Sequence, residues 1–477
     1  MGESTKETMP KGTRRRPPWG WIEIVVLVQF LAPGLVFIPG TGWLRTASRV
    51  AAFAVPLAAW ALIAAVGPRS VGRRFPAVPW LTFCAAWLVL SIANPGTNAL
   101  MSGAAEAMLS IAVMAPAFWA ARQGAVAPER IHRLVVLIFA VNGFSALLGI
   151  AQFYRPGTFN PPVIPVLLYS PETADSRFFE DAGGRKVLRP CGLTDTPGGA
   201  GLAGTYACVL GLGLALRPLT WWKRLGYLGV AAGGMGSIYL SHARVTLLIA
   251  LGGVLVLAAL LTLQRDFRKL LLLAGLGAAV FFGGLAWAVR EGGAAIAERF
   301  ATLLVDKPAD LYQSNRGYFL TATLLNFVPA YPLGAGLGRW GQPYMYFGQV
   351  RPLDDPRCAI SVELQWTAWA VDGGIPLMIA SVAALVATLF AGLRVAWSCP
   401  DRELRYLAAL ALALNFQVVA LTFGSLPFVG PIGVVFWALA AAVDAADQHI
   451  EARRRSQIQL LRQRKRAASR GPAQAGS

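Results

Sequence analysis

The sequence predicts an all-α polytopic membrane protein with about 12 transmembrane helices. Hydrophobic residues make up 56% of the 477 residues, charged residues only 14%, and the mean hydropathy is +0.53. This composition is too apolar for a soluble globular protein. The apolar residues also form long runs, and roughly 17–25 such residues cross a bilayer as a helix.

Twelve apolar segments can be followed along the chain. They cover residues 21–38, 50–66, 78–93, 105–121, 131–152, 197–216, 225–241, 244–263, 270–289, 373–396, 405–423 and 428–446. Pro33, Pro56 and Pro116 fall inside three of them. Helices in a membrane tolerate such kinks, so the prolines do not argue against these spans.

The basic residues lie mainly in alternate connections and in the two tails. The basic connections hold Arg69, Arg73 and Arg74; Arg122, Arg130 and Arg133; Arg217, Lys223 and Arg224; Arg265, Arg268 and Lys269; and Arg394, Arg402 and Arg405. Because cytoplasmic loops carry the excess of Lys and Arg, this side and both termini are predicted to be cytoplasmic. Arg45 and Arg49 are the exception. Since topology accounts for the net charge of +19, we expect no nucleic-acid partner.

The predicted organisation has seven parts. They are a cytoplasmic N-terminal tail (1–20), helices one to five (21–152), a first long outer loop (153–196), helices six to nine (197–289), a large outer loop (290–372), helices ten to twelve (373–446) and a basic cytoplasmic tail (447–477). Loops this long are usually functional. Residues 294–304 have the pattern of an amphipathic helix on the membrane surface.

One arginine stands against the charge bias. Arg244, in Ser241-His242-Ala243-Arg244, lies between two apolar runs on the outer side. A charge at such a position is costly and is usually kept because it faces a cavity and binds something. The alternative is that Arg244 caps a helix or extends its charge to the interface, as arginines near span ends often do.

Three other motifs accompany Arg244 on the outer side. They are Arg189-Pro190-Cys191-Gly192 with Pro197-Gly198, Asn315-Arg316-Gly317 leading to the run 332–338 (PLGAGLG), and Glu363 before Asp372-Gly373-Gly374. In this order and spacing the chain resembles the O-antigen polymerase and ligase family of bacterial envelopes. The resemblance covers about 140–380, including Gly149-Ile150-Ala151-Gln152.

The resemblance implies a GT-C-like fold with two long periplasmic loops in the bacterial inner membrane. It implies an inverting, metal-independent glycosyltransferase that uses an undecaprenyl-pyrophosphate-linked glycan. By family position Arg244 and Arg316 hold the pyrophosphate, and Arg189, Ser241 and His242 also bind substrate. No cofactor is expected. The implied partners are the lipid-linked glycan, membrane lipids, a chain-length regulator and a flippase.

The chemistry of these residue types agrees with that activity. A departing pyrophosphate gains charge, which fixed guanidinium groups stabilise in place of a metal ion. Arginine suits this better than lysine, since it presents a planar fork to phosphate oxygens. The acceptor hydroxyl needs a base, and the family's histidine position falls at Glu363. This difference favours a polymerase over a ligase. Asp195 and Asp355 are the next candidates.

Several alternatives stay open at this stage. The protein could be a ligase that transfers the finished glycan to lipid A core or another acceptor, a transporter of lipid-linked glycan, or a scaffold. Arg316 could form a loop ion pair with Asp306 or Asp310, and Glu363 could be structural. The glycines at 334, 336 and 338 are expected in turns with positive φ. Cys191 and Cys358 share the outer side, so a disulfide between them is conceivable.

Overall fold

The computed structural model describes residues 19–37, 42–66, 75–120, 128–160, 178–180, 186–194, 196–305 and 308–469. These residues are mainly helical, and six helices are long and apolar enough to cross a membrane. The six are α4 (Leu100–Trp119), α5 (Pro128–Tyr154), α10 (Arg244–Leu263), α11 (Phe267–Gly292), α17 (Gln365–Ser398) and α18 (Arg402–Leu421). The chain is therefore an all-α membrane protein in its main architecture.

The other six predicted spans are helical as well. They correspond to α1 (Trp21–Leu31) with η1 (Ala32–Phe37), α2 (Gly42–Val66), α3 (Val78–Ser91), α8 (Gly199–Ala215), α9 (Trp221–Leu240) and α19 (Pro431–Ser469). Their apolar parts are shorter or less apolar than those of the first six. Arg45 and Arg49, the exceptions to the charge bias, lie within α2.

Helix α8 lies at the centre of the helical body. All but one of its residues are buried, and it packs against α5, α9, α10 and α18. Small residues permit this packing: a Cβ added to Gly204 would lie 2.4 Å from the carbonyl oxygen of Gly234 on α9. Glycine at such a contact lets two helix backbones approach closely.

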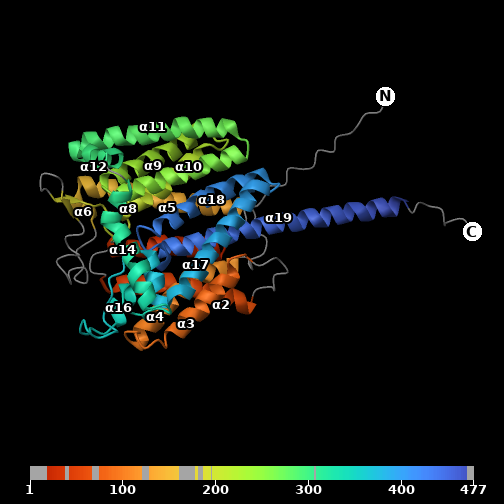
Figure 1. The fold of residues 1–477 in the computed structure, drawn as a ribbon. Helices are drawn as coiled ribbons and strands as arrows, with labels where there is room; N and C mark the ends of the chain where they lie inside the picture. Colours follow the sequence, from red (N-terminus) through yellow and green to blue (C-terminus); the bar gives the residue numbers. More distant parts are fainter. Residues whose placement is uncertain are drawn as a thin grey trace, which may run out of the picture.

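The ends of the molecule differ in what they carry. Helix α19 extends beyond the other helices at one end and carries the basic C-terminal segment (Figure 1). The short elements of the two long connections, including α6 (Pro156–Phe159), α12 (Ala294–Val305) and α16 (Gly341–Phe347), gather at the opposite end (Figure 1). The segments predicted to be outer loops therefore lie at one end of the bundle.

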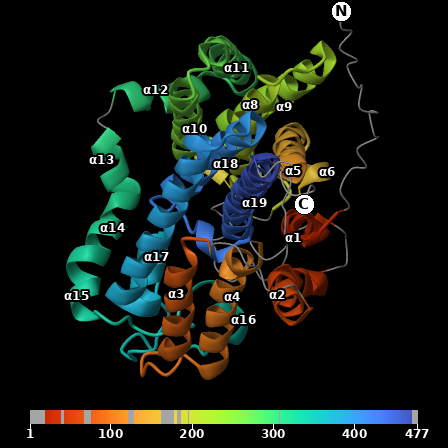
Figure 2. The ribbon, with the colours of Figure 1, turned by 90° about the vertical axis from the view of Figure 1, so that its right-hand side faces the viewer.

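The large connection, which was predicted as an outer loop with one amphipathic helix, is a series of short helices. After α12 come α13 (Pro308–Tyr312), π-helix η4 (Gln313–Gly317), α14 (Tyr318–Ala322), π-helix η5 (Thr323–Phe327) and α15 (Val328–Ala330). Figure 2 shows α12–α15 as an arc from the α10–α11 side of the bundle to α17. The predicted amphipathic helix at 294–304 is present as α12.

Two further details differ from the sequence predictions. Helix α17 begins at Gln365, eight residues before the predicted span, because its first turns are buried against the body. It kinks at Gly374, whose φ of 60° is left-handed. In the first long connection, β1 (Phe178–Glu180) and β2 (Lys186–Leu188) form an antiparallel pair with Phe179 opposite Val187.

Candidate active site

The segment that carries Arg189 is fixed to α5 by hydrogen bonds. The Gln152 side chain accepts a hydrogen bond from the Gly192 N–H at 2.8 Å and donates one to the Gly192 carbonyl at 2.9 Å. The Leu193 N–H donates to the Ser145 hydroxyl at 3.0 Å. A side chain at Gly192 would collide with Ser145, and its φ of +63° also favours glycine. The position of Arg189 is therefore set by α5.

Arg189 reaches the start of α8. Its guanidinium lies 3.4 Å from the place that a Cβ of Gly198 would take, and Gly198 has a φ of +75°. Gly199 is the first residue of α8. The N-terminal end of a helix carries partial positive charge and unpaired N–H groups, so anions bind there. Arg189 and this helix end thus present positive charge to the same place.

Arg244 lies at a second helix N-terminus. It is the first residue of α10, two residues after His242, which has a φ of 52° and is buried. The Ser241 hydroxyl donates to the Ser237 carbonyl at 2.7 Å. Ser241 is fully buried, and a Cβ at Gly201 of α8 would touch it. The structure therefore places Ser241 and His242 in the tight turn that brings Arg244 to the surface of the bundle.

Arg316 comes from the arc of short helices. It lies in the π-helix η4, and π-helical turns occur frequently at functional sites. Its side chain forms an ion pair with Glu363, which lies two residues before α17. Both side chains are about two-fifths exposed. Arg316 therefore pairs with Glu363 and not with Asp310, which was one alternative left open by the sequence; Asp306, the other, lies outside the described residues.

The pKa values show that these arginines share one electrostatic environment. Burial and the charge of Arg316 lower the pKa of Arg189. Burial, Arg244 and Arg189 lower the pKa of Arg299, which lies on α12. Burial also lowers the pKa of Arg316. We call Arg189, Arg244, Arg299 and Arg316 the arginine cluster. Arg189 is thus affected by the charge of Arg316, and Arg299 by the charges of Arg244 and Arg189, an arrangement suited to an anion with several charges.

Arg299 was not among the sequence-predicted site residues. A signal for it was present in the pattern of α12: Ile296 and Phe300 are buried, and Arg299 lies three residues after one and next to the other. Residues three apart share one helix face, so Arg299 lies on the side of the buried Ile296. A charged residue on the buried face of an amphipathic helix is unusual enough to indicate a site.

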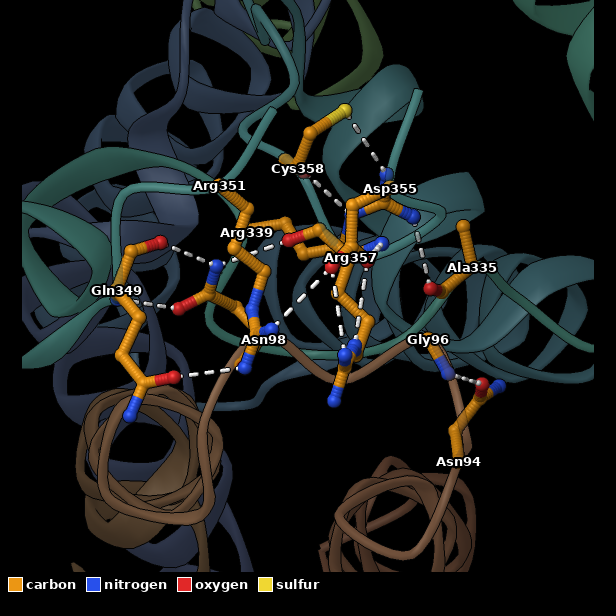
Figure 3. Close-up of polar contacts among 10 residues, drawn as sticks. All are labelled: Asn94, Gly96, Asn98, Ala335, Arg339, Gln349, Arg351, Asp355, Arg357 and Cys358. Carbon is orange, nitrogen blue, oxygen red and sulfur yellow. Dashed lines mark hydrogen bonds and ion pairs between the residues drawn. The ribbon is translucent and has the colours of Figure 1, made fainter. Parts of the chain in front are cut away.

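The rest of the large connection is fixed to the turn before α4. Asn98 donates hydrogen bonds to the carbonyls of Gln349 and Arg357, at 2.9 and 2.8 Å (Figure 3). Arg339, only 4% exposed, donates to the carbonyls of Ala335 and Cys358 (Figure 3). Gly334, Gly336 and Gly338 have φ of 95°, 100° and 69°, which confirms the turn predicted for them. This region is a rigid support for the segment that ends at Glu363.

The structure also bears on the predicted cysteine pair and on the two aspartates considered as alternative bases. Neither Cys191 nor Cys358 is in a disulfide, so the bond considered from the sequence is not formed. Asp355 accepts hydrogen bonds from Arg351 and Arg357 within the support (Figure 3). Asp195 lies outside the described residues. The described residues contain no group of three or more His, Cys, Asp and Glu that could hold a metal ion.

No family model matches this chain, and no match was found among curated proteins. The resemblance to the O-antigen polymerase and ligase family therefore stays a prediction from the motifs. The geometry adds one fact to it: three residues from separate motifs, Arg189, Arg316 and Glu363, are near one another in the folded chain.

Proposed function

We propose that the protein is an inner-membrane glycosyltransferase that joins polysaccharide repeat units carried on undecaprenyl pyrophosphate. The observation that carries this proposal is the arginine cluster with Glu363 ion-paired to one of its members. A diphosphate is the ligand whose charge and size match several converging guanidinium groups. The carboxylate beside them supplies a proton acceptor, which a pure anion-binding site does not need.

The reaction is a single inverting displacement. The oxygen of the acceptor hydroxyl attacks the anomeric carbon of the donor sugar and forms the new glycosidic bond. The bond between that carbon and the pyrophosphate oxygen breaks, and its electron pair stays on the lipid pyrophosphate. Glu363 takes the hydroxyl proton. The cluster stabilises the charge that develops on the leaving group, and it does so with groups already held in place.

The ion pair between Arg316 and Glu363 gives an order to these steps. Without substrate each group compensates the charge of the other. A bound pyrophosphate competes for Arg316, because two phosphates carry more charge than one carboxylate. Glu363 is then released toward the acceptor hydroxyl. The carboxylate is therefore released from its ion pair only when the donor is in place.

The membrane arrangement belongs to the same proposal. We infer twelve spans, with both termini cytoplasmic and the arginine cluster on the periplasmic side. This is supported by the charge bias of the short loops. It is also supported by the position of the basic part of α19, at the end opposite to α12 and α16 (Figure 1). A chain-length regulator and a flippase would be the partners of such an enzyme.

The test is a reaction in proteoliposomes that contain only purified protein and lipid-linked repeat units. We expect chain lengthening without a partner, abolished by Arg244→Ala and by Arg316→Ala and nearly abolished by Lys at either position. Arg290→Ala is the control, since Arg290 lies in the last turn of α11 and is not part of the arginine cluster or of the support. Transfer only to added lipid A core would instead identify a ligase.

A further inference from the structure

We propose that a second pocket beside the arginine cluster binds one uncharged sugar residue of the glycan. This inference rests on the proposed function and names what that site recognises. The pocket is a cavity of about 290 Å³ between α1, α5, α8 and the start of α19. Small-molecule sites usually have about 300–1,000 Å³, so this volume suits one sugar ring and not a whole repeat unit.

The lining of the pocket has the chemistry of a sugar site. None of its lining residues in the described part of the chain is charged. Its polar side chains are amides and hydroxyls, among them Gln29, Asn142, Ser145, Thr194, Thr196 and Tyr206. Amides and hydroxyls pair with sugar hydroxyls, and the apolar remainder covers the faces of the ring. A carboxylate or phosphate would be buried there without a counter-charge, which is unfavourable.

One side chain in the pocket is incompletely paired. Gln29 is fully buried, and its amide nitrogen donates to the carbonyl of Ala52. Its Oε1 is buried and has no hydrogen-bond partner. Buried polar atoms are nearly always paired, and each exception calls for an explanation. A hydroxyl of a bound sugar would donate to this oxygen.

The two walls of the pocket belong to the segments that carry or adjoin Arg189 and Glu363. One wall is the turn with Thr194, Thr196 and Gly199, which begins at Arg189 and passes its guanidinium at Gly198. The opposite wall includes Ser425, Leu426 and Pro427.

That second wall is hydrogen-bonded to the start of α17. The Gln365 N–H donates to the Ser425 carbonyl at 3.0 Å, and the Gln365 side chain accepts from the Phe428 N–H at 2.9 Å. Gln365 follows Glu363 by two residues. The pocket therefore lies between the segment that positions Arg189 and the segment that positions Glu363. A sugar held there is next to both the leaving group and the base.

The sugar can come from two sources with the same chemistry, the first residue of the donor or the terminal residue of the acceptor. Binding can be measured without turnover, by saturation-transfer NMR on the purified full-length protein in detergent. The probes are methyl glycosides of glucose, galactose, mannose and rhamnose, with glucuronate as the charged comparison. We expect at least one neutral glycoside to bind and glucuronate not to bind.

The variants Gln29→Leu and Tyr206→Phe should weaken that binding by about tenfold, whereas Arg316→Ala should leave it unchanged. Tyr227→Phe is the control for Tyr206, because Tyr227 packs against Phe139 and does not line the pocket. Tyr206→Phe keeps the ring and so tests the pocket even if Gln29→Leu fails to fold. In the turnover assay, a rise in KM for the donor or for the acceptor identifies the source.

The inference is wrong if no neutral glycoside binds, if glucuronate binds equally well, or if both pocket variants bind like the parent. These outcomes are distinct from failure of the proposed function. If the protein binds a neutral glycoside but forms no glycosidic bond, the sugar pocket is supported and the proposed transferase activity is contradicted. If both pocket variants lengthen chains with parental KM values, the transferase activity is supported and the sugar pocket is contradicted.

Discussion

Replacing Arg299 should lower activity strongly and leave stability nearly unchanged. Arg299 lies on the buried face of α12, where Arg244 and Arg189 lower its pKa together with burial. In the substrate-free protein it is thus repelled by like charges. With lipid pyrophosphate bound, the same guanidinium stabilises the leaving group. Arg299→Met keeps an unbranched side chain about as long as the apolar stem of arginine and removes the charge.

The magnitudes follow from these two states. Solvent and salt screen the repulsion between half-buried like charges, so removing one of them changes the free energy of unfolding only slightly. The substrate-free Arg299→Met protein should therefore have a Tm close to that of the parent. Loss of one preorganised donor to a developing anion costs about 2.7–4 kcal/mol, so kcat should fall by about 10²–10³.

Both quantities can be measured on the same purified samples, Tm by thermal unfolding in detergent and kcat by chain lengthening in proteoliposomes. Arg290→Met, in the last turn of the neighbouring α11, is the control and should leave kcat unchanged. The reasoning is refuted if Arg299→Met retains parental kcat. It is also refuted if its Tm falls well below that of the Arg290 variant, since Arg299 would then be a structural residue.

Three other outcomes are expected. Glu363→Gln should bind the donor at least as well as the parent, because Arg316 loses its ion pair, but it should transfer the glycan about 10²–10⁴-fold more slowly. Single-turnover kinetics would separate binding from transfer, and a parental transfer rate would mean that another residue is the base. Hydrogen bonds from the N–H and side chain of Arg357 lower the pKa of Asp355 from 3.8 to about 2, so its stabilisation of the support is present above pH 4 and lost as the pH falls toward 2. Pepsin should accordingly cut Asp355→Asn faster than the parent at pH 4 but equally at pH 2, and equal cleavage at both would contradict this. Cysteine labelling from outside the cell should reach a site at Asp354 but not at Ser456, and the reverse pattern would move the arginine cluster to the cytoplasm.

The helices were predictable because long apolar runs have few alternatives in a membrane. All twelve predicted segments are helical, although only six meet the length and hydropathy expected of a span. The large connection was less predictable. Its short helices depend on contacts with distant residues, such as the Thr323 hydroxyl at 2.7 Å from that of Thr367, and no local pattern encodes these contacts.

Part of the candidate site could likewise be predicted from the sequence, and part could not. Arg189, Arg244 and Arg316 were found because each lies in a short motif on the outer side. That Arg316 pairs with Glu363, and not with Asp310, depends on how the arc of helices returns to α17, which sequence does not reveal. The role of Gln152 was indicated only by its place in a motif, and the structure supplies the reason in its two hydrogen bonds to Gly192.

The most direct test of the account counts the leaving group. Purified protein in proteoliposomes, supplied only with lipid-linked repeat units, should release one undecaprenyl pyrophosphate for each new glycosidic bond. Arg244→Ala and Arg316→Ala should stop both processes together, since the account assigns the arginine cluster to that leaving group. Passage of the lipid-linked glycan across the bilayer with no bond formed and no pyrophosphate released would contradict the account and identify a transporter.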